Sequence, residues 1–305
     1  MKVLFVLGGG IGNIVQATPA IQAVASEGHT IDLKLHCNSS MEHSIFKLPC
    51  VRHVYGKRSP GLHEKYDVQL NGPFTPGTRY ASRKHLKTRI SYAQHLAEAE
   101  VYYDLAKQIG VTTIMPDAKV NVGNWPGKEK DPETIAIYPG SKHNWAMKRW
   151  DKYDELTSHF QKVLVVGSEK DIHSHGDPTW ITRLGKWPSH VEFLTGQLQD
   201  VAYAISTCKM FIGNDGGLAH VAAGTGIPTF VLFGPSSDVK NKPYSKNAHV
   251  VAIDLPCRPC QFEKGPDGLQ IFGENKADCP YKMKCMKEMS VEYVLKKIEE
   301  ITNDA

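Results

Sequence analysis

The sequence predicts a doubly wound α/β protein of two domains. Short continuous runs of Val, Ile, Leu and Phe, such as residues 3–7 and 229–233, alternate with helical stretches along the chain. Uninterrupted apolar runs of this kind are typical of parallel strands that helices cover on both faces. A segment rich in Gly, Pro and charge, residues 121–133, separates two halves that each begin with such a run. The length of 305 residues is enough for two hydrophobic cores.

The apolar runs that we expect to form strands follow one another with helical segments between them, which predicts parallel order. In chain order they are residues 3–7, 31–36, 51–55, 67–70, 135–138, 163–166, 191–194, 210–212, 229–233 and 250–253.

Three helices have clear start or stop signals. One is expected to begin at Thr18 as its N-cap, with Pro19 at the first helical position. A second is expected from about residue 91 to Gly110, because glycine commonly ends a helix. The third, residues 291–301, has apolar residues at helical spacing and Ser290 as its cap, so it predicts an amphipathic closing helix.

The composition is that of a folded protein without a membrane-spanning segment. The chain is 41% hydrophobic and 22% charged, and no window approaches eighteen apolar residues. The apolar run at residues 3–7 is too short for the core of a signal peptide, so we expect a cytoplasmic protein. The formal charge of +4 permits an anionic substrate but does not demand nucleic acid.

The most informative segment is a glycine-rich corner within residues 211–224. An apolar run ends in Asn-Asp-Gly-Gly, and a helix of small residues follows. Gly216 and Gly217 allow a ligand to approach the backbone, and the helix directs free N–H groups and its positive dipole end into the same space. Such a corner suits a phosphate group, with Asp215 beside it to take a sugar hydroxyl. The alternative is an ordinary strand-to-helix turn that Asp215 caps.

A first glycine corner, Gly-Gly-Gly-Ile-Gly-Asn at residues 8–13, follows the first strand. It is not the dinucleotide fingerprint, because Asn13 stands at the third glycine position and the second strand ends in His36 and Cys37 rather than in an acid. An enzyme that uses NAD is therefore disfavoured. Asn13 and Gln16 are expected to point from this corner.

Two further strand ends in the second half carry polar side chains. Ser141 follows one strand, and Lys148 and Arg149 come seven and eight residues later. A hydroxyl, backbone N–H groups and one or two cations could clamp a diphosphate, although an exposed loop is the alternative. Glu169 follows the next strand, where a carboxylate can accept two ribose hydroxyls or act only as a charge at a helix N-terminus.

Basic residues gather between Arg79 and Arg89, where the chain has no acid. Arg83 and Lys84 lie within this stretch. It is either a solvated surface or a patch for a phosphorylated or otherwise anionic acceptor.

Four of the seven cysteines cluster late in the chain as Cys257-x2-Cys260 and Cys279-x5-Cys285. Such clustering in a cytosolic chain suggests a metal before disulfides, although the second pair is spaced more widely than in a usual zinc ribbon. A structural zinc and free thiols both remain open, and a disulfide or an iron–sulfur group is less favoured.

These landmarks together resemble glycosyltransferase family 9, the family of the lipopolysaccharide heptosyltransferases. The motifs that carry the resemblance occur in order over most of the chain. They are Gly9-Gly10-Ile11-Gly12-Asn13 with Thr18-Pro19-Ala20, Pro139-Gly140-Ser141 with Lys148-Arg149-Trp150, Gly167-Ser168-Glu169, Asn-Asp-Gly-Gly-Leu-Ala-His-Val-Ala-Ala at residues 214–223, and Phe233-Gly234-Pro235.

The resemblance implies the GT-B architecture, in which two Rossmann-like domains face a cleft. It implies an acceptor-binding domain at residues 1–125, a nucleotide-sugar-binding domain at residues 133–289 and a closing helix at residues 290–305. It also implies inverting transfer from a nucleotide-diphosphate sugar, ADP-heptose-like or other, to a hydroxyl of a saccharide or glycolipid, without a catalytic cofactor. An anionic acceptor and peripheral contact with a membrane would be compatible with this activity.

Carried onto this sequence, the resemblance also implies roles for individual residues. Lys148 would neutralise the diphosphate, Glu169 would hold the ribose and Asp215 would hold the transferred sugar. The expected donor-binding residues are Ser141, Lys148, Glu169, Asp215, Gly216, Gly217, Leu218 and His220. The expected acceptor-binding residues are Gly10, Gly12, Asn13, Gln16, Arg83 and Lys84, and the expected catalytic residues are Asn13, Lys148 and Asp215.

One residue departs from the family pattern. The characterised heptosyltransferases carry an aspartate, the proposed general base, where this chain has Asn13. An asparagine amide cannot accept a proton in that role. Either another group is the base, or Asn13 only orients the acceptor.

Three alternative functions remain. The acceptor could be a modified nucleic-acid base, which the basic stretch would favour. The chain could bind a nucleotide sugar without transferring it, which Asn13 makes conceivable. An epimerase would need acid and base groups on both sides of the sugar, and the sequence offers no convincing pair of carboxylates.

Overall fold

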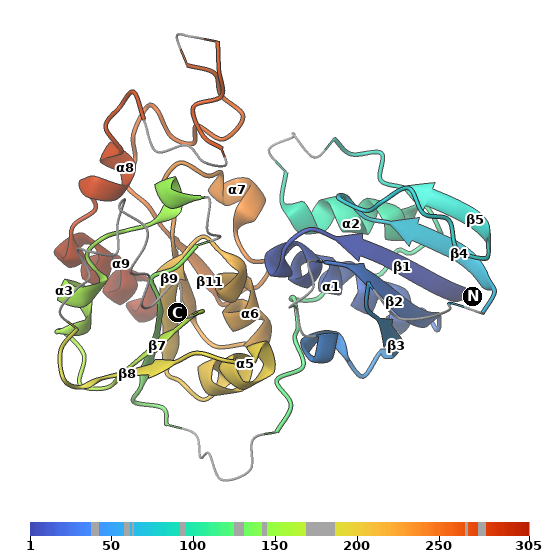
Figure 1. The fold of residues 1–305 in the computed structure, drawn as a ribbon, viewed down its shortest axis with the longest axis horizontal. Helices are drawn as coiled ribbons and strands as arrows, with labels where there is room; N and C mark the ends of the chain where they lie inside the picture. Colours follow the sequence, from blue (N-terminus) through green and yellow to red (C-terminus); the bar gives the residue numbers. More distant parts are fainter. Residues whose placement is uncertain are drawn as a thin grey trace.

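The computed structural model describes residues 1–37, 43–57, 62, 64–91, 96–124, 131–141, 145–168, 187–265, 268–273 and 279–304. It contains two parallel β-sheets that lie side by side, each with helices packed against it (Figure 1). This arrangement confirms the predicted doubly wound α/β fold in two domains, which is the GT-B architecture.

The first sheet has the strand order β3-β2-β1-β4-β5, and the described pairs are all parallel. Its helix α1 packs against α2 on one side and against α6 of the second domain on the other. The elements are β1 (Lys2–Gly8), α1 (Ile11–Ser26), β2 (Thr30–His36), η1 (His43–Phe46), β3 (Val51–Tyr55), β4 (Tyr66–Asn71), β5 (Ser82–Lys87) and α2 (Glu98–Lys107).

The second sheet has the order β11-β10-β9-β6-β7-β8, and its described pairs are parallel as well. Its elements are β6 (Ile135–Tyr138), η2 (Ala146–Lys148), α3 (Tyr153–Thr157), β7 (Val163–Val166), β8 (Val191–Leu194), α5 (Leu198–Ser206), β9 (Met210–Asn214), α6 (Gly217–Thr225), β10 (Thr229–Leu232), α7 (Asp238–Asn241), β11 (Ala248–Val251), α8 (Lys284–Lys287) and α9 (Val291–Asn303).

Each sheet has a point at which the strand order reverses direction. In the first sheet it lies between β1 and β4, and in the second between β6 and β9. Ligands of open α/β sheets bind outside the carboxyl ends of the strands at such points. The glycine corner at residues 8–13 follows β1, and the corner at residues 214–217 follows β9. The topology therefore places both predicted corners where ligands of this fold bind.

The continuous apolar runs of the second sheet are explained by burial on both faces. Successive side chains of a strand point to opposite faces. Ile135 and Ile137 pack with Trp150 and the apolar side of α9, while Ala136 and Tyr138 join the core that includes α5 and α6. A run of four apolar residues can therefore be buried throughout, as the sequence pattern indicated.

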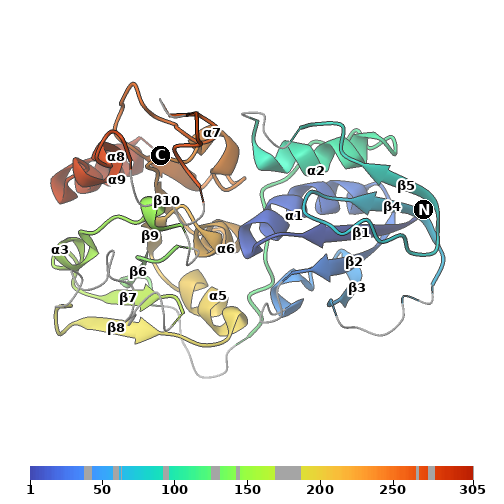
Figure 2. The same ribbon diagram turned by 45° about the horizontal axis from the view of Figure 1, so that its top comes forward.

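The two domains share a hydrophobic core through α1 and α6. Residues of both helices belong to one contiguous cluster of buried side chains, and both views show the helices at the junction of the two sheets (Figures 1 and 2). The segment after α2 is bonded to both domains, because Asn121 N–H donates to the Ile45 carbonyl and Val120 N–H donates to the Gly224 carbonyl. Helix α9 packs against β11 of the second domain.

The first predicted helix start is wrong. Helix α1 begins at Ile11, with Gly10 as its N-cap, and Pro19 lies inside it. A proline inside a helix leaves the carbonyl four residues earlier without its usual N–H donor. The hydroxyl of Thr18 donates to that carbonyl, Val15 O, at 2.8 Å. Thr18 and Pro19 therefore form a compensated pair within the helix rather than a start signal.

Two other details of the predicted elements differ. Helix α2 begins at Glu98 rather than near residue 91, and residues 92–95 lie outside the described part. The basic stretch contains the edge strand β5, which is not among the strands expected from the sequence. Its sequence, Ser-Arg-Lys-His-Leu-Lys, has no apolar run, so its pairing with β4 is a matter of tertiary structure.

No helix in the described part of the chain is long and apolar enough to cross a membrane.

Candidate active site

The two glycine corners face each other across the junction of the domains. A Cβ atom on Gly12 would come within 2.6 Å of the His220 ring, and a Cβ on Gly217 would come within 3.3 Å of Ile11. Side chains at either position would press the N-terminal ends of α1 and α6 apart. The glycines therefore allow the first turn of each helix to approach the other, and the predicted donor and acceptor corners become one site.

The centre of the site is an ion pair between Lys148 and Asp215. Lys148 Nζ lies 2.6 Å from Asp215 Oδ2, and the two side chains are 17% and 5% exposed. The aromatic rings of Trp145 and Phe272 lie beside the ammonium, with centroids 5.2 and 5.8 Å from Nζ. The structure thus brings together two residues that the sequence assigned to one site from positions 67 residues apart.

Asn214 holds the loops around this ion pair in place. Its side-chain oxygen accepts hydrogen bonds from Trp150 N–H at 3.2 Å and from the Tyr153 hydroxyl at 2.9 Å. Its amide donates to the Pro139 carbonyl at 2.6 Å and to the Gly140 carbonyl at 3.2 Å. A fully buried amide at the end of β9 therefore fixes the loop that follows β6.

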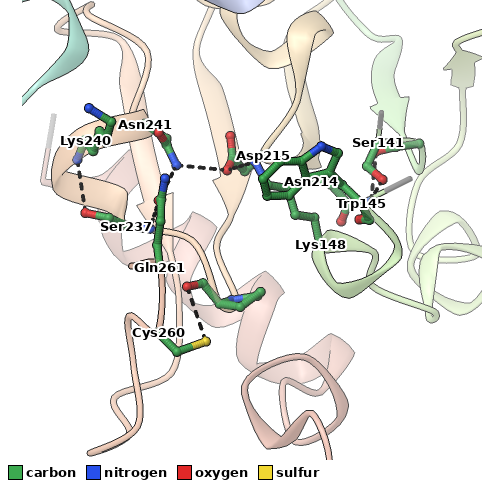
Figure 3. Close-up of polar contacts among 12 residues, drawn as sticks. Ser141, Trp145, Lys148, Asn214, Asp215, Ser237, Lys240, Asn241, Cys260 and Gln261 are labelled. Carbon is green, nitrogen blue, oxygen red and sulfur yellow. Dashed lines mark hydrogen bonds and ion pairs between the residues drawn. The ribbon is translucent and has the colours of Figure 1, made fainter. Parts of the chain in front are cut away.

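The second domain also contributes Asn241, from α7, to the site (Figure 3). Its amide donates to Asp215 Oδ2 at 3.5 Å and to the Gln261 side-chain oxygen at 2.9 Å. The same oxygen of Gln261 accepts Ser237 N–H at 2.8 Å. Asp215 therefore lies between a cation and an amide that are both held by neighbouring groups.

His220 supports the corner as a neutral side chain. Burial lowers its pKa to about 4, the charge of Asp215 opposes this shift and the charge of Lys148 adds to it. Its Nδ1 has no hydrogen-bond partner among the described residues. The ring packs against Gly12 of the first corner, and its expected role in donor binding stays a prediction.

Ser141 is a buried part of the loop before Lys148. Its hydroxyl donates to the Trp145 carbonyl at 3.1 Å and accepts from Arg149 Nε at 2.9 Å. These bonds order the loop, and a role in binding diphosphate stays a prediction. Glu169, the expected ribose ligand, lies outside the described residues.

The first corner is closed by Asn13. Its Oδ1 accepts Gly10 N–H at 2.7 Å, and its Nδ2 donates to Glu98 Oε1 at 2.7 Å. Gly8 lies against the Phe74 carbonyl so closely that no side chain would fit there. Asn13 is therefore fixed at both ends of its amide at the start of α1.

Gln16 is not placed toward a ligand in the structure. Its Nε2 donates to the Lys242 carbonyl at 3.0 Å, and its Oε1 accepts Tyr244 N–H at 3.1 Å. Both groups belong to the second domain. Gln16 thus joins the two domains, and its expected role with the acceptor finds no support in its position.

Arg83 and Lys84 lie on the edge strand β5, away from the first corner. In the sheet register, Lys84 of β5 lies opposite Val68 of β4, and Val68 lies opposite Val3 of β1. The corner begins five residues further along β1, at Gly8. Five residues of strand correspond to about 16 Å. Arg83 is 87% exposed and lies 3.8 Å from Asp67. Charged side chains on an edge strand discourage pairing with other chains, so the position favours the solvated-surface alternative.

The four late cysteines are free thiols in the structure, and Cys260 and Cys285 are buried. Burial, followed by the charges of the other three cysteines, raises the pKa of Cys285 to about 12, and burial with the charges of Cys279 and Cys257 raises that of Cys260 to about 11. Cys260 Sγ lies 3.7 Å from the Pro235 carbonyl (Figure 3). Among the described residues, however, no three His, Cys, Asp or Glu side chains are placed so that they could hold a metal ion. The zinc site formed by Cys257, Cys260, Cys279 and Cys285 stays a prediction.

Sequence reasoning missed three residues of the site. Glu98 bonds Asn13, and Asn241 bonds Asp215. Burial lowers the pKa of the third, Lys240, and the nearby charge of Glu98 opposes this shift. Their only local signals are weak, because Glu98 reads as an ordinary acid in a helical segment and α7 is a single turn capped by Ser237. The docking of the two domains brings them to the site.

Comparison with known proteins agrees with this geometry. Lipopolysaccharide heptosyltransferase 2 of Salmonella typhimurium is 32% identical over 127 residues, which cover 39% of this chain and 36% of that protein. The match thus spans about a third of the length of this curated relative.

Two solved structures share the fold along nearly the whole chain. The E. coli ADP-heptose lps heptosyltransferase II has a TM-score of 0.65 at 17% identity and covers both chains fully. The dodecameric iron-containing heptosyltransferase TibC, in complex with ADP-D-beta-D-heptose, has a TM-score of 0.70 at 14% identity and covers 99% of this chain and 76% of its own.

Residues 83–268 match the family described as glycosyltransferase family 9 (heptosyltransferase), and this range includes the second glycine corner and the loop of Lys148. The match extends over more than half of the chain. With the fold and the site in agreement, this chain belongs to glycosyltransferase family 9.

Proposed function

We propose that this protein is an inverting glycosyltransferase that moves a sugar from a nucleotide-diphosphate sugar to a hydroxyl of a saccharide or glycolipid. The observation that carries the proposal is the Lys148–Asp215 ion pair at the carboxyl end of β9, opposite the first glycine corner. Family membership and the heptosyltransferase relative support the same class of reaction. ADP-heptose is the first donor to examine, because one similar structure is an ADP-heptose lps heptosyltransferase and another is in complex with ADP-D-beta-D-heptose.

The diphosphate would bind between Lys148 and the N-terminus of α6. Gly216, the N-cap of α6, is extended and no described side chain caps the helix there. The N–H groups of Gly217 and Leu218 and the positive end of the helix dipole suit a phosphate. An incoming diphosphate would form an ion pair with the ammonium of Lys148. Asp215 would then be able to bind the hydroxyls of the sugar. These groups stabilise the charge that develops on the leaving diphosphate without a metal ion.

The sugar acceptor would enter from the first domain, toward Gly10 and Asn13. In an inverting reaction the acceptor oxygen attacks the anomeric carbon from the side opposite the diphosphate. The approach of the two corners supports this proposal, because the expected donor groups belong to the second domain and the expected acceptor groups to the first. The alternative acceptor, a modified nucleic-acid base, would use the same donor site and would show a steep salt dependence of DNA binding.

The test begins with thermal shift and turnover of a panel of ADP-, UDP- and GDP-sugars that includes ADP-heptose. A donor that binds the native state raises its melting temperature.

Asp215→Asn should abolish transfer while the protein remains folded. The matched control is Asp131→Asn, because Asp131 forms an exposed ion pair with Lys162 in the same domain, at 3.1 Å. Transfer by Asp215→Asn at the wild-type rate would refute the assignment of this carboxylate to the sugar. Binding of a donor without turnover would indicate a nucleotide-sugar-binding protein.

We also propose that the late cysteines form a structural metal site that takes no part in the transfer. The charges of Cys257 and Cys279 help to raise the pKa values of Cys260 and Cys285, which supports the proximity of the four thiols, and the similar TibC structure is iron-containing. Metal binding would require thiolate side chains to turn toward a common centre. Elemental analysis after purification without a metal-chelating tag should find about one zinc or iron per chain in a site of this type. Protein free of both metals would leave the cysteines as free thiols.

A further inference from the structure

The proposed transfer needs a group that takes the proton of the acceptor hydroxyl, and position 13 cannot supply it. The amide of Asn13 has no proton-accepting capacity at ordinary pH. Its position is nevertheless well defined, at the start of α1 and within the first glycine corner. The question is which carboxylate lies close enough to serve in its place.

The structure places a carboxylate directly against Asn13. Glu98 is the first residue of α2 and is 4% exposed, and its Oε1 accepts the Asn13 Nδ2 hydrogen bond at 2.7 Å. The hydroxyl of Tyr102, one turn later on α2, donates to the same oxygen at 3.3 Å. Asn13 and Glu98 are 85 residues apart in the chain, so the packing of α2 against α1 creates this contact.

The hydrogen bonds around Asn13 decide which end of its amide faces Glu98. Its oxygen accepts Gly10 N–H, so its nitrogen is the end that can donate to the carboxylate. An aspartate at position 13 would satisfy Gly10 but would place a second negative charge against Glu98. Two carboxylates at hydrogen-bond distance cannot both ionise easily. The pair Asn13 and Glu98 therefore carries one negative charge. That charge lies on position 98 here, whereas an aspartate would place it on position 13.

The second domain places a lysine near this carboxylate. Lys240 of α7 is fully buried; burial lowers the pKa of its ammonium group, and the charge of Glu98 opposes this shift. In turn, a cation nearby favours the ionised form of a carboxylate. Asn241, the next residue, bonds Asp215 of the donor corner. One turn of helix thus connects the carboxylate of the first domain with the sugar-binding carboxylate of the second.

We propose that Glu98 is the general base of this enzyme and that Asn13 orients it. This inference rests on the proposed function. The acceptor oxygen would form its bond to the anomeric carbon while its proton passes to the Glu98 carboxylate. The bond between the anomeric carbon and the diphosphate oxygen would break, and its electron pair would leave with the nucleoside diphosphate. Glu98 would then lose its proton to solvent, which returns the site to its initial state.

The test is to exchange the two side chains. Glu98→Gln keeps an oxygen that can accept the Asn13 hydrogen bond but cannot take a proton. We expect kcat to fall by about 10²- to 10⁴-fold, the usual contribution of a general base, with donor affinity unchanged. Asn13→Asp should also lose activity, because it sets two carboxylates together. The double variant Asn13→Asp/Glu98→Gln restores one carboxylate and one amide, and it should recover most of the activity lost by Glu98→Gln.

The control is Glu100→Gln, which changes a partly exposed glutamate in the same turn of α2. Glu100 lies 3.8 Å from the ammonium of Lys107. It should retain wild-type kcat. Each variant is assayed with the donor that the wild-type protein turns over best in the panel, by release of nucleoside diphosphate with water and with saccharide acceptors, and thermal melting checks folding. A kcat of Glu98→Gln within about threefold of wild type would overturn the proposal, as would a folded double variant no more active than Glu98→Gln. If the wild-type protein turns over no donor, the proposed function itself fails, and this inference with it.

Discussion

The state of His220 gives a sharp prediction about stability. The folded protein lowers the pKa of this ring from 6.5 to about 4, chiefly because burial disfavours the charged form. Between these two values the unfolded chain binds a proton at this residue and the folded chain does not. Stability from this source is complete above about pH 6.5 and decreases as the pH falls toward 4.

The size of the effect follows from the shift. A pKa unit corresponds to about 1.4 kcal/mol, so the full shift is worth about 3 kcal/mol below pH 4. Between pH 7.5 and pH 5, where about three-fifths of the interval between the two pKa values is crossed, the loss of stability should be about 2 kcal/mol. His220→Gln removes the titrating group and leaves a neutral polar side chain, so this part of the pH dependence should disappear.

Urea unfolding at pH 7.5, 6.5, 5.5 and 5.0 measures the free energy of unfolding of wild type and variant. Carboxylates titrate in both proteins, so the informative quantity is the difference between them at each pH. That difference should narrow by about 2 kcal/mol between pH 7.5 and pH 5. His159→Gln, at an exposed histidine, should show no narrowing. If the free energies of unfolding of wild type and His220→Gln differ by the same amount at every pH, the interpretation of His220 as a neutral, buried ring is refuted.

Three further predictions concern other contacts. Arg52→Ala should lower the free energy of unfolding, measured in urea, by about 3–5 kcal/mol. The variant leaves the fully buried Asp32 without the guanidinium that bonds both of its oxygens. A loss below about 1 kcal/mol would contradict this expectation. Gly12→Ala should cost about 1–3 kcal/mol by overpacking against His220, measured in the same way, and an unchanged stability would mean that the helices separate freely. Transfer activity should survive excess EDTA in a short assay, since Lys148 and the α6 N-terminus carry the diphosphate charge; a loss that magnesium restores would contradict the metal-independent mechanism.

Much of the fold could be predicted from local patterns. The apolar runs correspond closely to β1, β2, β3, β6, β7 and β8. The pattern is clearest in β1, β6 and β7, because a strand that is buried on both faces needs apolar residues throughout. The edge strand β5 was missed for the opposite reason, since its exposed faces tolerate charge. The start of α1 was misplaced because a Thr-Pro pair is also a common helix start signal. In this helix the pair lies in the interior, where the Thr18 hydroxyl bonds the carbonyl that Pro19 leaves without a donor.

The sequence by itself determined most of the strands, the alternation of strands and helices, the two glycine corners and the assignment of Lys148 and Asp215 to one site. These features depend on residues close in the chain or on a motif order typical of the family. The contacts of Asn13 with Glu98, of Asn241 with Asp215 and of Gly12 with His220 were decided by the tertiary structure alone. The physical reason is that these contacts depend on how α1 packs against α2 and α6, and no local spacing along the chain encodes the distance between separate helices.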